Sequence, residues 1–265
     1  MKKYGFIGAG KMAGAIVKGL VKESASPSDI ACTCGNDDTG KNLATETGIE
    51  CLDNVKELLE NSHIVVLACK PQQLADVAAV ATNAKNEMLI SILAGTPIAR
   101  LRECFPSVKK IVRVMPNMPA QISQGISCYA PESALSELER NIVETVLGAI
   151  GEFIEIEEAR LDAVTALSGS GPVYIFEFAA AMIEAAKHIG FSQEEAVKLV
   201  NKTMLGSAML LSQSPLSADE LRTAVSSPGG TTLAGLSQFE SADLRGTMVK
   251  VLESAQKRSK ELSKF

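Results

Sequence analysis

Apolar runs and amphipathic segments alternate along the first part of the chain. Between Lys11 and Lys22, apolar residues recur at helical spacing and predict a helix. Apolar runs without polar alternation are typical of strands that are covered on both faces. Such runs predict strands at Tyr4–Gly8, Ile30–Cys34, His63–Cys69, Met88–Leu93, Lys110–Met115, Gly125–Ala130 and Gly151–Ile156, with a helix near Ser136–Leu147. Strands separated by helices predict an α/β fold with a doubly wound, mainly parallel sheet.

The pattern changes near Arg160, after which the chain offers no further strand candidate. Helices are predicted instead at Leu161–Leu167, Pro172–Ile189, Gln193–Leu211, Ala218–Val225, Thr231–Phe239 and Leu244–Leu262. Glycines and prolines separate these helices. We therefore expect two domains, residues 1–158 with the sheet and residues 159–265 with helices only.

The helix that begins at Pro172 is apolar on nearly all sides, which is typical of a helix buried all round. A small helical domain can hardly surround it alone, so we expect a homodimer in which a second copy covers it. The alternative is the central helix of a monomeric bundle. Glu177 and Glu184 interrupt the apolar run, which falls short of the ~20 residues of a membrane span. We therefore expect no contact with a membrane.

Composition narrows the class of protein. The net charge is -5 and no basic stripe is present, which argues against nucleic acid as a partner. The six cysteines contain no CxxC pair and only two histidines occur, so we expect no metal site and reduced, buried thiols. A strand begins within a few residues of Met1, so we expect no signal peptide and a cytoplasmic protein.

A glycine-rich motif, Gly8-Ala9-Gly10-Lys11-Met12-Ala13, joins the first strand to the first helix. In this GxGxxA pattern the first glycine allows a tight turn, and the second lets the backbone approach a pyrophosphate. The small third residue lets helix and strand pack closely. The helix N-terminus offers N–H groups to the phosphates. The motif predicts a site for a nicotinamide dinucleotide.

The end of the second strand bears on the choice between NAD and NADP. An acid there would hold the ribose 2′-OH of NAD. The strand ends Cys32-Thr33-Cys34-Gly35, and acids follow only at Asp37 and Asp38. Thr33 and Cys34 could accommodate a 2′-phosphate. This arrangement favours NADP and leaves NAD as the alternative.

Two further turns, Cys69-Lys70-Pro71 and Ala94-Gly95-Thr96-Pro97, follow strands at the edge where ligands of such sheets bind. They could contact the cofactor or serve only as connections. Asn54 could likewise cap the helix from Val55 or touch the adenosine. In the helical half, the turn Ser226–Thr232 leads into a helix N-terminus. It could bind an anion such as a substrate carboxylate, or it could be purely structural.

Together these segments resemble pyrroline-5-carboxylate reductase over essentially the whole chain. The resemblance is carried by Gly5–Ala13, Cys69–Gln72, Arg113–Pro119, Leu167–Pro172 and Val225–Leu236, the last of which is the family signature. It implies NAD(P)H-dependent reduction of the cyclic imine 1-pyrroline-5-carboxylate to L-proline, the last step of proline biosynthesis. It also implies a Rossmann-type domain followed by an all-α dimerisation domain, with homodimers that often assemble into a decamer.

The resemblance also assigns site residues by position. The cofactor, NADPH or alternatively NADH, would contact Ile7, Gly8, Ala9, Gly10, Lys11, Met12, Thr33, Cys34, Asn54, Ala68, Cys69, Lys70, Pro71, Leu93, Ala94 and Gly95. The cyclic imino acid would be held by Gly229, Gly230, Thr231 and Thr232. The family commonly has Ser at the ribose-side position where this chain has Thr33 or Cys34. Thr232 would be the catalytic residue that bonds the ring nitrogen, since a hydroxyl can donate and accept.

Other functions compete with this one. A β-hydroxyacid dehydrogenase or a broader imine reductase would have a similar architecture. The hydroxyacid enzymes place a catalytic Lys one turn into the helix after a glycine-rich turn. Here no Lys follows Gly169-Ser170-Gly171 until Lys187, which argues against alcohol–ketone chemistry. A non-enzymatic NADP sensor would not need the turn Ser226–Thr232.

Overall fold

The computed structural model describes residues 1–33, 35, 37–81 and 83–263. By its internal contacts the chain divides into two compact units. The first unit contains Met1–Ser170 and Ala255–Phe265, and the second contains Gly171–Ser254. The predicted domain boundary between residues 158 and 159 stays a prediction, because contacts show which residues pack together and not where an independently folding domain ends.

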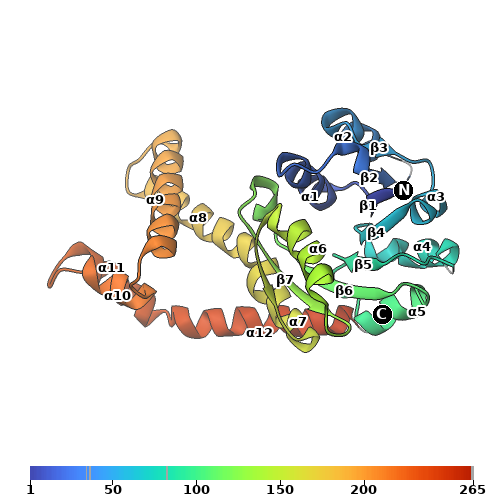
Figure 1. Ribbon diagram of the computed structural model, residues 1–265. Coiled ribbons are helices and arrows are strands. Elements are labelled where there is room, and N and C mark those ends of the chain that lie inside the picture. Colours follow the sequence, from blue (N-terminus) through green and yellow to red (C-terminus); the bar gives the residue numbers. More distant parts are fainter. Residues whose placement is uncertain (34, 36, 82, 264–265) are drawn as a thin grey trace. The chain divides into compact units, whose positions relative to one another are not determined.

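The first unit is built on one eight-stranded sheet with the strand order β3-β2-β1-β4-β5-β6-β7-β8 (Figure 1). Its strands are β1 (Lys2–Ile7), β2 (Ile30–Thr33), β3 (Glu50–Cys51), β4 (Ser62–Leu67), β5 (Met88–Ser91), β6 (Lys110–Met115), β7 (Gly125–Pro131) and β8 (Gly151–Glu155). Neighbouring strands are parallel except β6 and β7, which are antiparallel. The connection from Pro116 to Gln124 is shorter than the roughly a dozen residues that a parallel crossover needs. The predicted doubly wound, mainly parallel sheet is confirmed.

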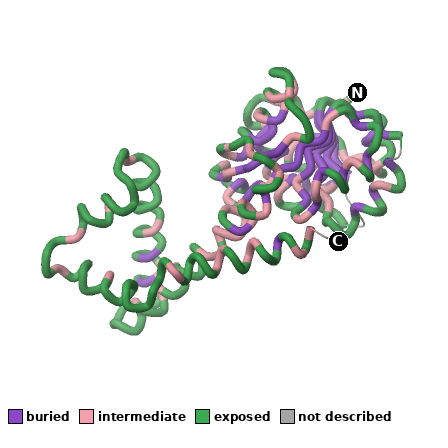
Figure 2. Tube along the Cα trace, turned by 90° about the horizontal axis from the view of Figure 1, so that it is seen from below, coloured by how far each residue is buried: buried purple, intermediate pink, exposed green. Residues whose placement is uncertain are grey.

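Helices cover both faces of this sheet. They are α1 (Lys11–Lys22), α2 (Thr39–Thr47), α3 (Val55–Glu60), α4 (Leu74–Val80), α5 (Ile98–Cys104), α6 (Glu137–Gly148) and α7 (Leu161–Val164), with short 3-10 turns at η1 (Pro27–Asp29), η2 (Pro71–Gln73), η3 (Met118–Ile122) and η4 (Glu158–Arg160). In β4, Ile64 and Val66 belong to one buried cluster, whereas Val65 and Leu67 belong to the other. The strands lose alternation in sequence because both faces are buried (Figure 2).

Some elements of the first unit escaped prediction. The strand β3 has only two residues, too few for a pattern. The helix α2 is mostly polar and buries only Gly40 and Leu43, so its apolar periodicity is weak. The helices α4 and α5 are short and lie between strands whose own apolar runs dominated the pattern.

The regular elements of the second unit, every residue of which the structure describes, are all helices. They are α8 (Gly171–His188), α9 (Gln193–Gln213), α10 (Ala218–Ala224), α11 (Thr231–Ser241) and α12 (Leu244–Leu262), whose end from Ala255 belongs to the first unit. Two of them begin with capping boxes, Ser192 with Glu195 and Ser217 with Glu220. In such a box, serine and glutamate satisfy each other's free backbone N–H groups at the helix start. The predicted all-α second half is confirmed.

The helix α8 is exposed within the single chain. None of its residues is buried, and Val173, Ile175 and Phe176 are each 56% exposed. The alternative of a central helix in a monomeric bundle is therefore wrong. An apolar helix that its own chain does not cover is typical of an interface with a partner.

Candidate functional site

The turn between β1 and α1 contains the predicted glycine-rich motif. Gly8 adopts a φ of +101°, which glycine reaches without strain, and its N–H donates to the Thr33 carbonyl at 2.9 Å. A Cβ on Gly8 would lie 2.7 Å from the carbonyl oxygen of Ala68. The fold itself therefore requires Gly8, because both its conformation and its neighbour exclude a side chain.

Gly10 differs from Gly8 although both lie in the same turn. It is the N-cap residue of α1 with an ordinary φ of -68°, and a Cβ on it would meet no atom of the described chain within 4 Å. The fold does not need glycine here, and the open space fits the close approach of a pyrophosphate to the backbone. The first turn of α1, Lys11–Gly14, carries no acidic side chain. Its free N–H groups and the helix dipole therefore favour an anion.

A cavity of about 470 Å³ lies where β1, β2 and β4 end. It is lined by five of the predicted cofactor-binding residues, Ile7, Gly8, Thr33, Asn54 and Cys69. The Asn54 side chain also caps α3, because its oxygen accepts the Glu57 N–H at 2.8 Å. Its capping role is confirmed, and its contact with adenosine stays a prediction. Gln73 and Val77 line the same cavity but were not predicted, since they lie on η2 and α4, where the sequence pattern is weak.

The carboxylate of Asp37, the first acid after β2, is bonded within its own loop. It accepts hydrogen bonds from Thr39 Oγ1 at 2.5 Å and from the Thr39 N–H at 3.1 Å. These two bonds hold the pKa of Asp37 below its usual value. Thr33 is buried at the end of β2, and Cys34 lies outside the described residues. The Asp37 carboxylate is therefore hydrogen-bonded to the first residue of α2, and Asp37 does not lie at the end of β2 itself.

The turn after β4 presents a neutral thiol to this cavity. Burial raises the pKa of Cys69 to about 11, so the side chain is a thiol near pH 7 and not a nucleophilic thiolate. The turn is closed locally, because the Lys70 N–H donates to Gln73 Oε1 at 3.0 Å and Pro71 begins η2. Cys69 therefore offers a contact surface rather than reactive chemistry.

The other predicted cofactor-binding residues of the first unit lie in two further cavities and in the core. The cavities hold about 570 Å³ and about 300 Å³ and are lined, respectively, by Pro71, Ala94 and Gly95 and by Ala9, Gly10 and Lys11. Leu93 is buried in one of the two large apolar clusters, and Met12 and Ala68 pack against the other. The side chains of these three residues serve packing. The N–H of Ala68 donates to the Ile7 carbonyl at 2.9 Å, and that of Leu93 donates to Ser91 Oγ at 3.4 Å.

In the second unit, the predicted anion-binding turn joins α10 to α11. Gly229 has a φ of +72°, and Gly230 is the N-cap of α11 without a side-chain cap. Thr231 and Thr232 begin this eleven-residue helix, are exposed, and are followed by no acidic residue in the first turn. The uncapped N–H groups favour an anion such as a carboxylate. A Cβ on Gly230 would lie 2.5 Å from Ser227 Oγ and 3.1 Å from the Ser227 carbonyl oxygen, so a side chain fits here only if Ser227 shifts.

The start of α8 bears on the dehydrogenase alternative. A π-helical turn, η5 (Thr165–Gly169), precedes α8, which begins at Gly171. The first lysine of α8 is Lys187, in the last turn of the helix. The lysine that a hydroxyacid dehydrogenase would carry one turn into this helix is therefore absent from α8.

Two family models match the chain. The model described as pyrroline-5-carboxylate reductase dimerisation matches residues 158–262. The model described as NADP oxidoreductase, coenzyme F420-dependent, matches residues 3–95. The two matches fall on the helical part and on the glycine-rich part of the chain, respectively.

Several relatives are similar over nearly their whole length. The pyrroline-5-carboxylate reductase of Glycine max is 35% identical over 262 residues, which cover 98% of this chain and 95% of the relative. The solved pyrroline-5-carboxylate reductase from Coxiella burnetii has a TM-score of 0.91 at 32% identity and covers 100% of this chain and 99% of its own. The Plasmodium falciparum pyrroline carboxylate reductase, solved with NADP bound, has a TM-score of 0.85 at 29% identity and covers 99% and 98%.

Proposed function

This chain belongs to the pyrroline-5-carboxylate reductase family, and we propose that it reduces 1-pyrroline-5-carboxylate to L-proline with NAD(P)H, the last step of proline biosynthesis. The observation that carries the proposal is the pair of uncapped helix starts, at Gly10 and at Gly230, in a chain that matches reductases along its length. One helix start suits a pyrophosphate and the other a substrate carboxylate.

The first unit fits a dinucleotide at three places. In a doubly wound sheet the dinucleotide spans the point where the strand order reverses, here between β1 and β4. We propose that the turn Gly8–Gly10 holds the pyrophosphate and that the cavity beside Thr33 and Asn54 receives the adenosine. The nicotinamide half then falls on the side of β4 and β5, where Leu93–Gly95 follows β5. When bound, the cofactor supplies a hydride to the C5 atom of the imine ring.

We take NADPH as the cofactor and keep NADH as the alternative. The sequence at the end of β2 carries no acid, and the carboxylate of Asp37 is bonded to Thr39. The Plasmodium falciparum relative was solved with NADP. Comparing kcat/KM for NADPH and NADH measures the preference, and a higher value for NADH would overturn it.

The second unit supplies the groups for the imino acid. The N–H groups of Gly230 and Thr231 would fix the carboxylate, with Gly229 giving the turn its shape. The Thr232 hydroxyl would bond the ring nitrogen and orient the C=N bond for hydride addition. The nitrogen gains one proton in the reaction. A threonine hydroxyl is a poor proton source, so we propose that water or an already protonated imine supplies it.

A homodimer accounts for the exposed apolar surface of α8. The matched dimerisation model covers this helix. By length and composition alone, the helical stretch Glu158–His188 could also cross a membrane. An apolar helix that is covered by a second copy in a dimer meets the same criteria of length and composition. We propose a cytoplasmic homodimer, and an assembly of dimers into a decamer.

One assay separates the competing functions. NADPH oxidation is followed at saturating 1-pyrroline-5-carboxylate, with proline identified as the product. Turnover supports the proposal, and no turnover would overturn it. A parallel assay with NADP and β-hydroxy acids tests the dehydrogenase alternative, which the position of Lys187 disfavours. NADPH binding without turnover on either substrate would identify a sensor.

A further inference from the structure

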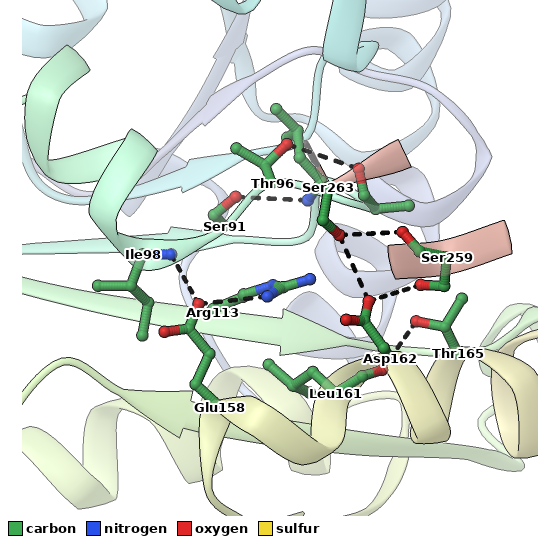
Figure 3. Close-up of polar contacts among 12 residues, drawn as sticks. Ser91, Thr96, Ile98, Arg113, Glu158, Leu161, Asp162, Thr165, Ser259 and Ser263 are labelled. Atoms are coloured by element: carbon green, nitrogen blue, oxygen red, sulfur yellow. Dashed lines mark hydrogen bonds and ion pairs between the residues drawn. The ribbon is translucent and has the colours of Figure 1, made fainter. Parts of the chain in front are cut away.

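The loop between β5 and α5 carries three predicted cofactor contacts and is held by segments far away in the sequence (Figure 3). Within the loop, the Leu93 N–H donates to Ser91 Oγ at 3.4 Å, and Thr96 Oγ1 donates to the Ala94 carbonyl at 3.5 Å. Ser91 and Thr96 are both buried. These two bonds are long, so the loop depends on further contacts for its position.

Glu158 holds the end of this loop. Its Oε1 atom accepts the N–H of Ile98, the first residue of α5, at 2.7 Å. Pro97, the N-cap residue of α5, provides no side-chain cap. The carboxylate therefore takes the place of the missing cap, from 60 residues further along the chain.

The same carboxylate oxygen also pairs with a buried charge. Arg113 Nη1 lies 3.2 Å from Glu158 Oε1, and the Arg113 side chain is 7% exposed. Arg113 on β6 is the register partner of Ser91 at the end of β5. Glu158 thus connects the start of α5 to β6, which lies beside β5, the strand that leads into the loop. Without Glu158, the buried Arg113 would lose its ion-pair partner.

The end of α12 closes the loop from another side. Gly95 has a φ of +68°, and a Cβ on it would lie 3.5 Å from both the carbonyl carbon and the Cβ atom of Leu262. The Asp162 carboxylate accepts the hydroxyl of Ser259, which is 5% exposed, at 2.7 Å. This bond fixes α12 so that Leu262 lies against the loop.

We propose that Glu158 is a positioning residue that holds the loop Leu93–Gly95 in the conformation that receives the nicotinamide half of the cofactor. The inference rests on the proposed function, since that function assigns the loop to this half. Glu158 acts through the N–H of Ile98 and through Arg113, while Leu262 supports the same loop. The adenosine half, beside Thr33 and Asn54, does not depend on this arrangement.

Titration calorimetry with two ligands tests the proposal on the purified dimer. NADPH probes both halves of the cofactor site, and 2′,5′-ADP probes only the adenosine half. We expect Glu158→Ala to raise the Kd of NADPH about tenfold, the size of a lost charge-assisted hydrogen bond, and to leave the Kd of 2′,5′-ADP within about twofold. Glu158→Gln keeps an acceptor for Ile98 and should raise the Kd of NADPH by only about threefold.

Glu157→Ala is the matched control, because Glu157 is exposed and adjacent in sequence; it should change neither affinity. An unchanged NADPH affinity in Glu158→Ala would overturn the proposal. An equal loss for both ligands would also overturn it, because a general structural role would weaken both. If Glu158→Ala fails to fold, Glu158→Gln decides by the same two criteria. A wild-type chain that binds neither ligand would overturn the proposed function and this inference with it.

Discussion

The two units of the chain bury their apolar residues to different extents. In the first unit, β1, β4 and β5 contribute buried side chains to the clusters on both faces of the sheet. In Gly171–Ser254, all of which the structure describes, only Ala196 and Val200 are buried. Phe176 and Phe178 of α8 remain 56% and 42% exposed. The first unit is complete within one chain, whereas the second exposes much of its apolar surface.

This difference in burial distinguishes the proposed cofactor site from the proposed substrate site. Burying one large apolar side chain contributes about 1.5–3 kcal/mol, so the second unit has much to gain from a second copy. The proposed cofactor groups lie in the unit that is already packed. The proposed substrate groups, Gly229–Thr232, lie in the unit that we expect to be completed by dimerisation.

Replacing Phe176 by Glu should abolish the dimer and leave the first unit folded. An unpaired charge in an apolar interface costs several kcal/mol. We expect monomers by size-exclusion chromatography with light scattering, and a loss of reductase activity of about a hundredfold or more. NADPH binding should persist, because the proposed cofactor groups all lie in the first unit. Glu177→Gln on the same helix is the control, and a Phe176→Glu protein that stays dimeric and active would contradict the division.

Replacing Gly10 by Val should weaken the cofactor site without unfolding the first unit. A Cβ on Gly10 would meet no described atom of the chain within 4 Å, so we expect the new side chain to crowd the proposed pyrophosphate position rather than the fold. We expect the Kd of NADPH to rise about a hundredfold, with the melting temperature within about 2–4 °C of wild type. Calorimetry and thermal unfolding measure the two effects.

Gly8→Ala is the matched comparison for that variant. Here the strain of a positive φ and the nearby Ala68 carbonyl act on the fold itself, so we expect a loss of stability of about 1–3 kcal/mol. Equal melting temperatures for the two variants would show that the distinction between the glycines is wrong.

Replacing Thr232 by Ala tests the second unit at its proposed site. A lost catalytic hydrogen bond should lower kcat/KM by between about ten- and a hundredfold, with the dimer intact. Ser237→Ala, further along α11, removes an exposed hydroxyl that bonds only the Ala234 carbonyl in the structure, and it should leave the kinetics unchanged. Unaltered kinetics in Thr232→Ala would remove this residue from the mechanism.

The smallest effect concerns the titration of Cys69. Its pKa of about 11 lies above the value of 9.0 for an unperturbed thiol, so the folded state holds the proton more tightly than the unfolded chain. The resulting stability is fully present below pH 9 and is lost as the pH rises toward 11. We expect a shallower fall of the melting temperature over this range in Cys69→Ser than in wild type. Parallel curves would show that the thiol is not protected by burial.

The sequence pattern predicted those features that depend mainly on residues close to one another in the chain. The unalternated run at β4 reported burial on both faces, and the spacing of Gly8, Gly10 and Ala13 located the turn before α1. The apolar character of α8 indicated a partner. The motif also assigned the tight turn to Gly8 and the approach of the pyrophosphate to Gly10. It could not show that a side chain at Gly8 would meet the Ala68 carbonyl, because that contact forms only in the folded chain.

Contacts between distant segments could not be predicted from the same patterns. Nothing in the sequence pairs Glu158 with the N–H of Ile98, or Ser259 with Asp162, across separations of 60 and 97 residues. These bonds form only because the sheet brings β5 and β6 side by side and because α12 returns to the first unit. The bond between Asp37 and Thr39 differs from these, because it spans only two residues and was missed for another reason: it precedes a helix with a weak apolar pattern.

The return of α12 makes the helical unit an insertion rather than an appendage. The chain leaves the first unit after Ser170 and comes back at Ala255, so two covalent tethers hold the second unit. Two tethers restrict its orientations more than a single linker would. Less rotational entropy then remains to be lost when two copies associate. The packing of the end of α12 on the first unit thus favours association, because the free chain then has less rotational entropy to lose.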